Sequence, residues 1–197
     1  MNQFWNQRYA VEEYVYGTEP NRFLQEQLKK LLPGIILLPA EGEGRNAVFA
    51  ARNGWDVTAF DSSTEAKKKA DQLAVIHKTN IIYLLNDFEN VHFDLNSFDC
   101  IALIYAHMQP GKRKTYHRKL TDYLKKGGTL ILEGFSKDQI NKTTGGPRNI
   151  DMLFSEKELK DDFSGFAELQ INKREIEFNE GRFHQGIASV IRVVGLK

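Results

Sequence analysis

The sequence predicts an α/β fold with a doubly wound, mostly parallel, Rossmann-like sheet of seven strands that ends in an antiparallel hairpin. Three observations predict it. Short apolar runs alternate with segments of helical periodicity through most of the chain, which is typical of parallel strands joined by helices. The run 35–38 is continuously apolar, as in a strand buried on both faces of a parallel sheet. The last two strand-like segments, 168–178 and 187–194, are separated only by residues 179–186, too few for a helical crossover, so they should be antiparallel neighbours.

The first half of the chain alternates helices and strands. Apolar side chains at helical spacing follow Asn21, whose residue type caps helices, and Pro33-Gly34 ends that helix. Gly54 is a typical left-handed stop for the next helix. The expected helices in this half are 21–32, 45–53 and 64–77, and the expected strands are 35–38, 55–60 and 81–85.

The second half continues the pattern and then departs from it. A helix that Gly127-Gly128 stops lies between two apolar strands, and Ser155 and Glu158 have the spacing of a capping box. No helix is expected between the final two strands. The expected helices are 115–124 and 155–163, and the expected strands are 98–105, 129–133, 168–178 and 187–194.

Composition narrows the classes of protein. A chain of 197 residues is long enough for one domain with a substantial core, and its net charge of +1 favours neither nucleic acid nor a membrane surface. The basic stretch 112–126 lacks interleaved stacking aromatics and is interpreted as a solvated helix face rather than a nucleic-acid site. A single cysteine, Cys100, and a polar N-terminal segment favour the cytoplasm. Cys100 itself is interpreted as a buried apolar side chain.

A glycine-rich turn follows the first predicted strand. Residues 42–47, Gly-Glu-Gly-Arg-Asn-Ala, fit the relaxed pattern of a dinucleotide-binding turn. Glycines there let main chain approach a ligand closely, and the following helix N-terminus favours negative charge. A plain tight turn is the alternative interpretation.

Two acidic residues extend this pattern toward a nucleoside. Asp61 ends the second strand, 19 residues after Gly42, where a carboxylate accepts hydrogen bonds from both ribose hydroxyls. Its alternative role is to cap the helix that starts near Ser62. Asp87 follows the third strand and is placed to read an adenine amino group, with Phe88 against the ring; the alternative is a surface turn. A nicotinamide enzyme and an S-adenosylmethionine enzyme share these features, but the C-terminal hairpin is unusual for the former.

With these segments the sequence resembles the class I S-adenosylmethionine-dependent methyltransferases, and within them a small bacterial group similar to the tellurite-resistance and thiopurine methyltransferases. The resemblance spans nearly the whole chain. It implies one domain over 1–197, with an N-terminal lid and helix at 1–32, a cofactor-binding core at 35–135, and a flap and C-terminal hairpin at 136–197. The segments that carry it are 4–9, 16–21, 41–46, 55–61 and 124–128.

The resemblance implies S-adenosyl-L-methionine as the cofactor and assigns residues to it. The glycine turn would surround the methionine moiety, Asp61 would hold the ribose, and the segment after the fourth strand would lie near the methyl group. Trp5 and Tyr16 would belong to the lid. The residues expected to contact the cofactor are Trp5, Tyr16, Ala40, Glu41, Gly42, Glu43, Gly44, Asn46, Asp61, Ser62, Asp87, Phe88, Tyr105 and Ala106.

The glycine turn departs from the family pattern at two positions. Leu38 stands where the family often has an acidic residue, and Ala40 stands where it has the first of three glycines. We expect Glu41, or else Glu43, to replace the lost contact with the methionine ammonium group.

The acceptor side is less specific. Methyl transfer is an in-line displacement that needs no metal, and it needs a general base only when the acceptor starts protonated. His107 is the candidate catalytic residue, with a histidine satisfied by main chain as the alternative. Glu133 could face the pocket or cap the next turn. Residues 143–149 are interpreted as a flap, with Arg148 available for an anion, and His184 as a solvated residue of the hairpin turn. No histidine has metal-ligand spacing.

The predicted function is methylation of a small-molecule acceptor by a cytoplasmic bacterial enzyme. We expect no nucleic-acid or membrane partner, and a monomer or weak homodimer. The alternatives are a nicotinamide-dependent oxidoreductase and a non-catalytic module that binds S-adenosylmethionine. The missing first glycine and the missing strand carboxylate, at Ala40 and Leu38, keep the non-catalytic alternative open.

Overall fold

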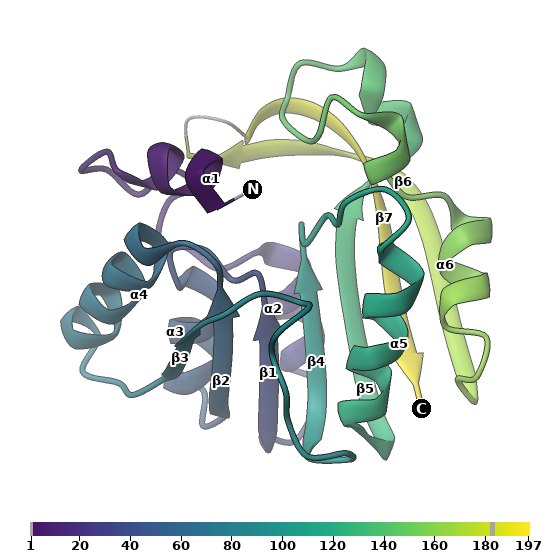
Figure 1. The fold of residues 1–197 in the computed structure, drawn as a ribbon, viewed down its shortest axis with the longest axis horizontal. Coiled ribbons are helices and arrows are strands. Elements are labelled where there is room, and N and C mark those ends of the chain that lie inside the picture. The colour runs from purple at the N-terminus through teal and green to yellow at the C-terminus, as the bar shows by residue number, and fades with distance from the viewer. Residues whose placement is uncertain (1, 182–183) are drawn as a thin grey trace.

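A computed structural model describes residues 2–181 and 184–197 and contains one seven-stranded sheet in the order β3-β2-β1-β4-β5-β7-β6 (Figure 1). The first five strands pair in parallel, and β7 pairs antiparallel with both β5 and β6. The predicted fold class is therefore confirmed. The strands are β1 (Ile35–Pro39), β2 (Asp56–Asp61), β3 (Ile82–Leu85), β4 (Phe98–Ile104), β5 (Leu124–Phe135), β6 (Glu168–Glu180) and β7 (His184–Leu196).

The helices lie where the local signals predict them, with shifted ends. Ser155 and Glu158 form the predicted capping box, and Asn21 accepts a hydrogen bond from the Leu24 amide as the predicted cap. An additional helix, α1, forms in the N-terminal segment. The helices are α1 (Asn2–Tyr9), α2 (Arg22–Leu28), α3 (Arg45–Arg52), α4 (Thr64–Ile76), α5 (Arg113–Tyr123) and α6 (Glu156–Asp162), with the 3-10 helices η1 (Lys137–Asn141) and η2 (Ile150–Met152).

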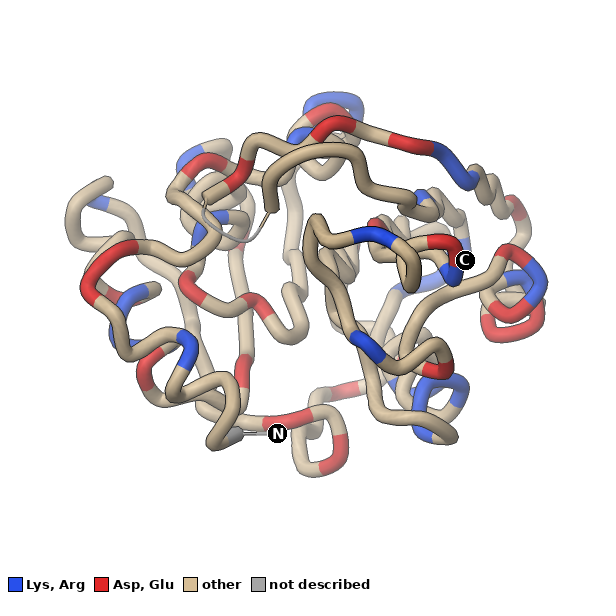
Figure 2. Tube along the Cα trace, turned by 90° about the horizontal axis from the view of Figure 1, so that it is seen from above, with Lys and Arg blue, Asp and Glu red and all other residues tan. Residues whose placement is uncertain are grey.

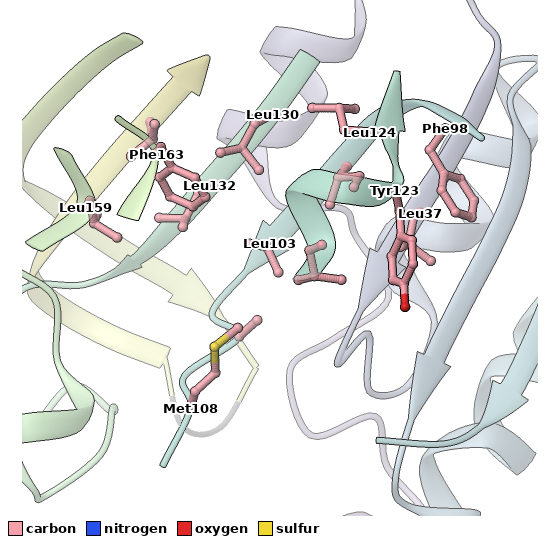
Figure 3. Packing of buried hydrophobic residues seen from close by; sticks show 14 of the residues in the cluster. Leu37, Phe98, Leu103, Met108, Tyr123, Leu124, Leu130, Leu132, Leu159 and Phe163 are labelled. Atoms are coloured by element: carbon pink, nitrogen blue, oxygen red, sulfur yellow. The ribbon is translucent and has the colours of Figure 1, made fainter. Parts of the chain in front are cut away.

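Alternate side chains of the buried strands feed two cores. Ile36 and Leu38 of β1 pack with α2 and α3 on one face, whereas Leu37 belongs to the cluster beneath α5 and α6 on the other. Part of the second cluster, including Leu103, Leu124 and Leu132, is visible in Figure 3. Cys100 is fully buried in the first core, as predicted. The alternation gives a three-layer α/β/α arrangement.

The predicted hairpin is longer than its sequence signal suggests. β6 and β7 pair from Glu168 with Leu196 up to Glu180 with His184, and β5 continues to Phe135 because β7 pairs with it there. The far end of the hairpin arches over the carboxyl edge of the sheet to the side on which α1 lies (Figure 1). That edge therefore has cover from both ends of the chain.

Charge does not single out one face of the molecule. Seen from above, Lys and Arg are interspersed with Asp and Glu around the described part of the chain (Figure 2). None of the helices described for residues 2–181 and 184–197 has the length and apolar character that a bilayer crossing requires.

Candidate active site

A cavity of about 930 Å³ lies at the carboxyl edge of the parallel strands. This is the edge at which open α/β sheets bind ligands. Its walls come from the N-terminal segment, the turn after β1, the ends of β2, β3 and β4, the loop between η1 and η2, and the start of β7. Of the 14 residues expected at the cofactor, all except Gly44 line it.

Gly42, in the turn after β1, lines this cavity. Its φ of +66° lies in the left-handed region, and a Cβ atom there would stand 2.8 Å from the Tyr9 hydroxyl. The Gly42 amide donates to the Asp61 carboxylate over 3.1 Å, and its carbonyl accepts from the Tyr83 hydroxyl. Glycine is required because both the backbone conformation and the approach of Tyr9 exclude a side chain.

Gly44 has a different task from the predicted one. It caps the N-terminus of α3 with a φ of +87°, and a Cβ atom there would stand 2.6 Å from the Ala70 Cβ atom and 2.8 Å from the Ala70 Cα atom of α4. It does not line the cavity. The prediction that Gly44 presents main chain to a ligand is therefore wrong; this glycine lets two helices pack closely.

Ala40 occupies the position at which the family pattern has its first glycine. Its φ is +52°, a left-handed conformation that costs a residue with a Cβ atom about 1–2 kcal/mol. Ala40 therefore holds a conformation that glycine adopts freely.

Glu41 reaches the cavity but is already engaged by main chain. Its carboxylate accepts hydrogen bonds from the amides of Asn46 and Ala47, at 2.8 and 2.7 Å, at the start of α3. Burial raises the pKa of Glu41 to about 7, against the lowering effect of these hydrogen bonds. A cationic ligand group nearby would restore the charged form.

Asp61 lies at the end of β2, where it orders the turn before α4, and its assignment to a ribose stays a prediction. One carboxylate oxygen accepts from the Ser63 amide at 2.9 Å and the other accepts from the Gly42 amide at 3.1 Å. The residue is 8% exposed and lines the cavity, as does Ser62. Burial raises the pKa of Asp61, while the hydrogen bonds from the main chain lower it. The carboxylate is thus fixed in orientation at the end of β2.

Asp87 and Phe88 lie beside each other at the end of β3. Asp87 organises its own turn, accepting from the amides of Glu89 and Asn90 at 3.0 and 2.8 Å. The Phe88 ring stacks on Tyr116 with centroids 5.5 Å apart, and both rings line the cavity. The predicted surface turn is therefore present, and it forms part of the cavity wall.

Two buried ion pairs fasten the N-terminal segment over the glycine turn. Glu43 pairs with Lys69 of α4 at 2.8 Å and also accepts from the Val15 amide at 2.8 Å. Arg45 donates to the Tyr16 carbonyl at 3.1 Å and pairs with Glu180 of β6 at 2.8 Å. Glu43 is thus committed to protein partners, and the segment that carries Trp5 and Tyr16 is held above the cavity.

His107 is satisfied by main chain at both ring nitrogens. Nδ1 donates to the Met152 carbonyl at 2.8 Å, and Nε2 accepts from the Phe135 amide at 3.0 Å. Desolvation lowers the pKa of His107 to about 4, so it is neutral near pH 7. It lines the cavity but has no free lone pair. The geometry replaces the predicted catalytic role with the alternative one: His107 joins the ends of β4 and β5 to η2.

Glu133 neither faces the cavity nor caps the next turn. It is 1% exposed and accepts from Tyr105, Asn21 and Arg192. Tyr105 has a φ of +53° and turns its hydroxyl to Glu133 at 2.6 Å. This buried network fixes the chain after β4, where Tyr105 and Ala106 line the cavity.

The predicted flap does reach the cavity. All seven residues of 143–149 line it. Thr144 donates to the Ile187 carbonyl of β7 at 3.0 Å and accepts from Gln139 at 2.8 Å. Arg148 donates to the Lys142 carbonyl at 2.8 Å. The loop is thereby tied to η1 and to β7.

His184 is predicted from the sequence to be solvated, and this prediction is wrong. It begins β7, is 5% exposed and lines the cavity, rather than lying in a solvated turn. Its Nδ1 atom lies 3.4 Å from the Glu180 carboxylate. The sequence signal for this position is Gly181, because glycine is typical of hairpin turns. Its φ is +60°, and Glu180 beside it pairs directly with His184 at the end of the hairpin.

Another contact that the sequence does not predict, between His117 and Asp162, lies away from the cavity. The two side chains meet at 2.8 Å between α5 and α6 and are almost fully buried. Arg113 also donates to Asp162 at 2.7 Å. Their spacing of 45 residues gives no local signal.

Comparison with known proteins finds a methyltransferase domain in this part of the chain. Residues 36–128 match a family described as a methyltransferase domain. That range contains the glycine turn and the ends of β2, β3 and β4. No curated protein matches the chain.

Several solved structures share the fold at low sequence identity. One concerns the conversion of a disulfide bond into a thioacetal group during echinomycin biosynthesis; it has a TM-score of 0.75 and 16% identity and covers 99% of this chain and 90% of its own. TehB from Haemophilus influenzae has a TM-score of 0.72 and 17% identity, covering 100% and 66%. A SAM-dependent methyltransferase from Methanosarcina mazei has a TM-score of 0.68 and 19% identity, covering 87% and 96%.

Proposed function

We propose that this chain is an S-adenosylmethionine-dependent methyltransferase and that it transfers the methyl group to a small molecule held in the same cavity as the cofactor. The observation that carries the proposal is the cavity of about 930 Å³ at the carboxyl edge, which is lined both by the cofactor candidates and by aromatic side chains. Its volume falls in the range of roughly 300–1,000 Å³ typical of small-molecule sites.

The cofactor would lie along the ends of β1, β2 and β3. In this proposal Asp61 accepts from the ribose hydroxyls, Asp87 and Phe88 contact adenine, and Gly42 lies against the methionine moiety. Glu41, whose carboxylate borders the cavity, would face the methionine ammonium group. The sulfonium would then point toward the segment after β4, at Tyr105.

The acceptor would enter from the side of β5 and β7. Phe135, Met152 and the loop 143–149 line that end. Methyl transfer requires the nucleophile, the methyl carbon and the sulfur in line, in a place where water does not compete. Walls from the N-terminal segment and the hairpin support such enclosure.

The likeness to other proteins supports the fold rather than a particular acceptor. A structural relative takes part in converting a disulfide bond into a thioacetal group during echinomycin biosynthesis. At 16% identity this likeness shows the fold alone. The proposed acceptor class is therefore argued from the cavity of this chain.

Calorimetric titration with S-adenosylhomocysteine and, separately, with NADH tests the cofactor part. We expect saturable 1:1 binding of S-adenosylhomocysteine and none of NADH. Incubation with S-adenosylmethionine and a small-molecule panel, followed by mass spectrometry for a gain of one methyl group, tests the acceptor part. Methylation confined to protein or nucleic acid would contradict the proposal.

A further inference from the structure

We propose that His184, oriented by Glu180, is the general base of the transfer and that the acceptor is an aromatic compound reacting through a hydroxyl group. The inference rests on the proposed function and assigns the proton acceptor and substrate class of that same site.

The position of His184 satisfies what a general base needs. Its Nδ1 faces the Glu180 carboxylate at 3.4 Å, which favours the tautomer with the proton on Nδ1. Nε2 then keeps its lone pair and has no hydrogen-bond partner among residues 2–181 and 184–197. Because His184 lines the cavity, that lone pair is available to a bound molecule. A carboxylate, an imidazole and an open nitrogen form the usual acid-base arrangement.

The other candidate bases near this end are committed elsewhere. His107 uses both ring nitrogens on the main chain of Phe135 and Met152. The Tyr105 hydroxyl donates to Glu133. His184 is therefore the cavity histidine with a free nitrogen.

Burial keeps His184 in the neutral form, which can accept a proton. Burial is the largest influence and lowers its pKa, while the nearby Glu180 raises it. The titratable and charged groups that face it are Tyr16 of the N-terminal segment, Arg45 of α3, Tyr105 and His107 after β4, Glu133 of β5 and Glu180 of β6. Glu180 in turn is anchored by Arg45 at 2.8 Å, so the carboxylate is fixed.

The rings around His184 point to an aromatic acceptor. Tyr16 and Tyr105 lie with ring centroids 4.7 and 5.0 Å from that of His184, and Phe135 lies at 5.6 Å. Flat apolar walls favour stacked or edge-on rings. The acidic residues that line the cavity, namely Glu41, Glu43, Asp61, Asp87 and Glu89, come from the turn after β1 and the ends of β2 and β3. At the aromatic end the Glu180 carboxylate is already engaged by Arg45 and His184, so it is not open to a cationic amine. This favours a neutral hydroxyl.

The step balances without a further reactant. The acceptor oxygen attacks the methyl carbon, a C–O bond forms, and the C–S bond breaks with its electron pair remaining on sulfur. The hydroxyl proton passes to His184 Nε2, giving an imidazolium that Glu180 stabilises. The products are the methyl ether, S-adenosylhomocysteine and a proton that His184 later releases to water.

Matched pairs of probes test the proposal: phenol and 2-naphthol against thiophenol and 2-naphthalenethiol, at pH 7.5. The phenols are protonated at this pH, whereas the aromatic thiols are largely ionised and need no base. We expect His184→Gln to lower kcat for the phenols at least about 100-fold and to change kcat for the thiols less than about 3-fold. Binding of S-adenosylhomocysteine should be unchanged. His92→Gln, an exposed histidine, is the matched control.

The pH dependence of kcat distinguishes a role of His184 in proton transfer from a purely structural role. With phenols, kcat of the wild type should rise with pH through one ionisation, and Glu180→Gln should shift that ionisation to lower pH because the imidazolium loses its partner. An equal loss on phenols and thiols in His184→Gln would overturn the general-base role. A wild type that binds S-adenosylhomocysteine but methylates neither phenol would overturn the acceptor class. Absence of S-adenosylhomocysteine binding would instead contradict the proposed function.

Discussion

The two ends of the cavity are built from different materials. The cofactor end consists of main chain and carboxylates joined over short sequence distances, such as Glu41 with Asn46 and Asp61 with Ser63. The acceptor end consists of rings and a histidine brought together from β4, β5 and the hairpin, such as Tyr105 with His184. The first can be encoded locally, whereas the second exists only once the sheet has closed. The difference teaches that the two ends depend on different parts of the chain, one on near neighbours and the other on the closed sheet.

The largest expected effect concerns packing beneath the cofactor end. Gly44→Ala should lower the free energy of unfolding by about 2–5 kcal/mol, because a left-handed alanine and a collision with α4 add together. Urea unfolding measures it. Gly111→Ala is the matched control, since Gly111 has a φ of +78° but nothing within 4 Å, so it should lose only about 1–2 kcal/mol. Equal losses would show that α4 does not restrict position 44.

The next effect concerns His107 at the acceptor end. Its pKa falls from 6.5 to about 4 on folding, so the unfolded chain binds the proton more readily. The contribution of this pKa shift to the free energy of unfolding is therefore complete above about pH 6.5 and is lost as the pH falls toward about 4. The loss is at most about 3 kcal/mol.

Urea unfolding of the wild type and His107→Gln at several pH values isolates this contribution, because shifts of other groups largely cancel in the difference. The variant should be less stable at pH 7 and lose less stability on acidification. Parallel curves for the two proteins would remove His107 from the pH dependence.

A smaller effect probes the carboxylate that links the glycine turn to the proposed ribose site. Asp61→Ala should weaken S-adenosylhomocysteine binding by about 1–3 kcal/mol, since hydrogen-bonding groups lose their partner. Titration calorimetry measures it. Asp56→Ala, at the opposite end of β2 and exposed, serves as the control. Unchanged affinity in Asp61→Ala would reject the ribose assignment.

The smallest expected effect comes from restoring the family glycine. Ala40→Gly relieves a left-handed alanine, worth about 1–2 kcal/mol, but it gives the unfolded chain more freedom, which costs about 0.5–1 kcal/mol. We expect a net gain of about 0.5 kcal/mol in unfolding free energy and no change in S-adenosylhomocysteine affinity. Loss of stability on this substitution would mean that the Ala40 methyl group packs usefully.

The comparison of the two ends also explains what the sequence could predict. Local sequence patterns predict the strands, the capping box at Ser155 and the positions of Asp61 and Asp87 at the cavity, because each of these features depends on residues nearby in the sequence. Gly44 misled because a glycine that faces a ligand and one that faces a helix look alike in a sequence. His184 was misplaced because its burial depends on Tyr16, Tyr105 and Phe178, all far from it along the chain or across the hairpin.

A crystal structure of the protein with S-adenosylhomocysteine tests the central claim most directly. The account predicts ribose hydroxyls on Asp61, adenine beside Asp87 and Phe88, and the sulfur directed toward Tyr105, with space for one aromatic ring between it and His184. A ligand bound outside this cavity, or bound within it with the sulfur turned away from His184, would contradict the account.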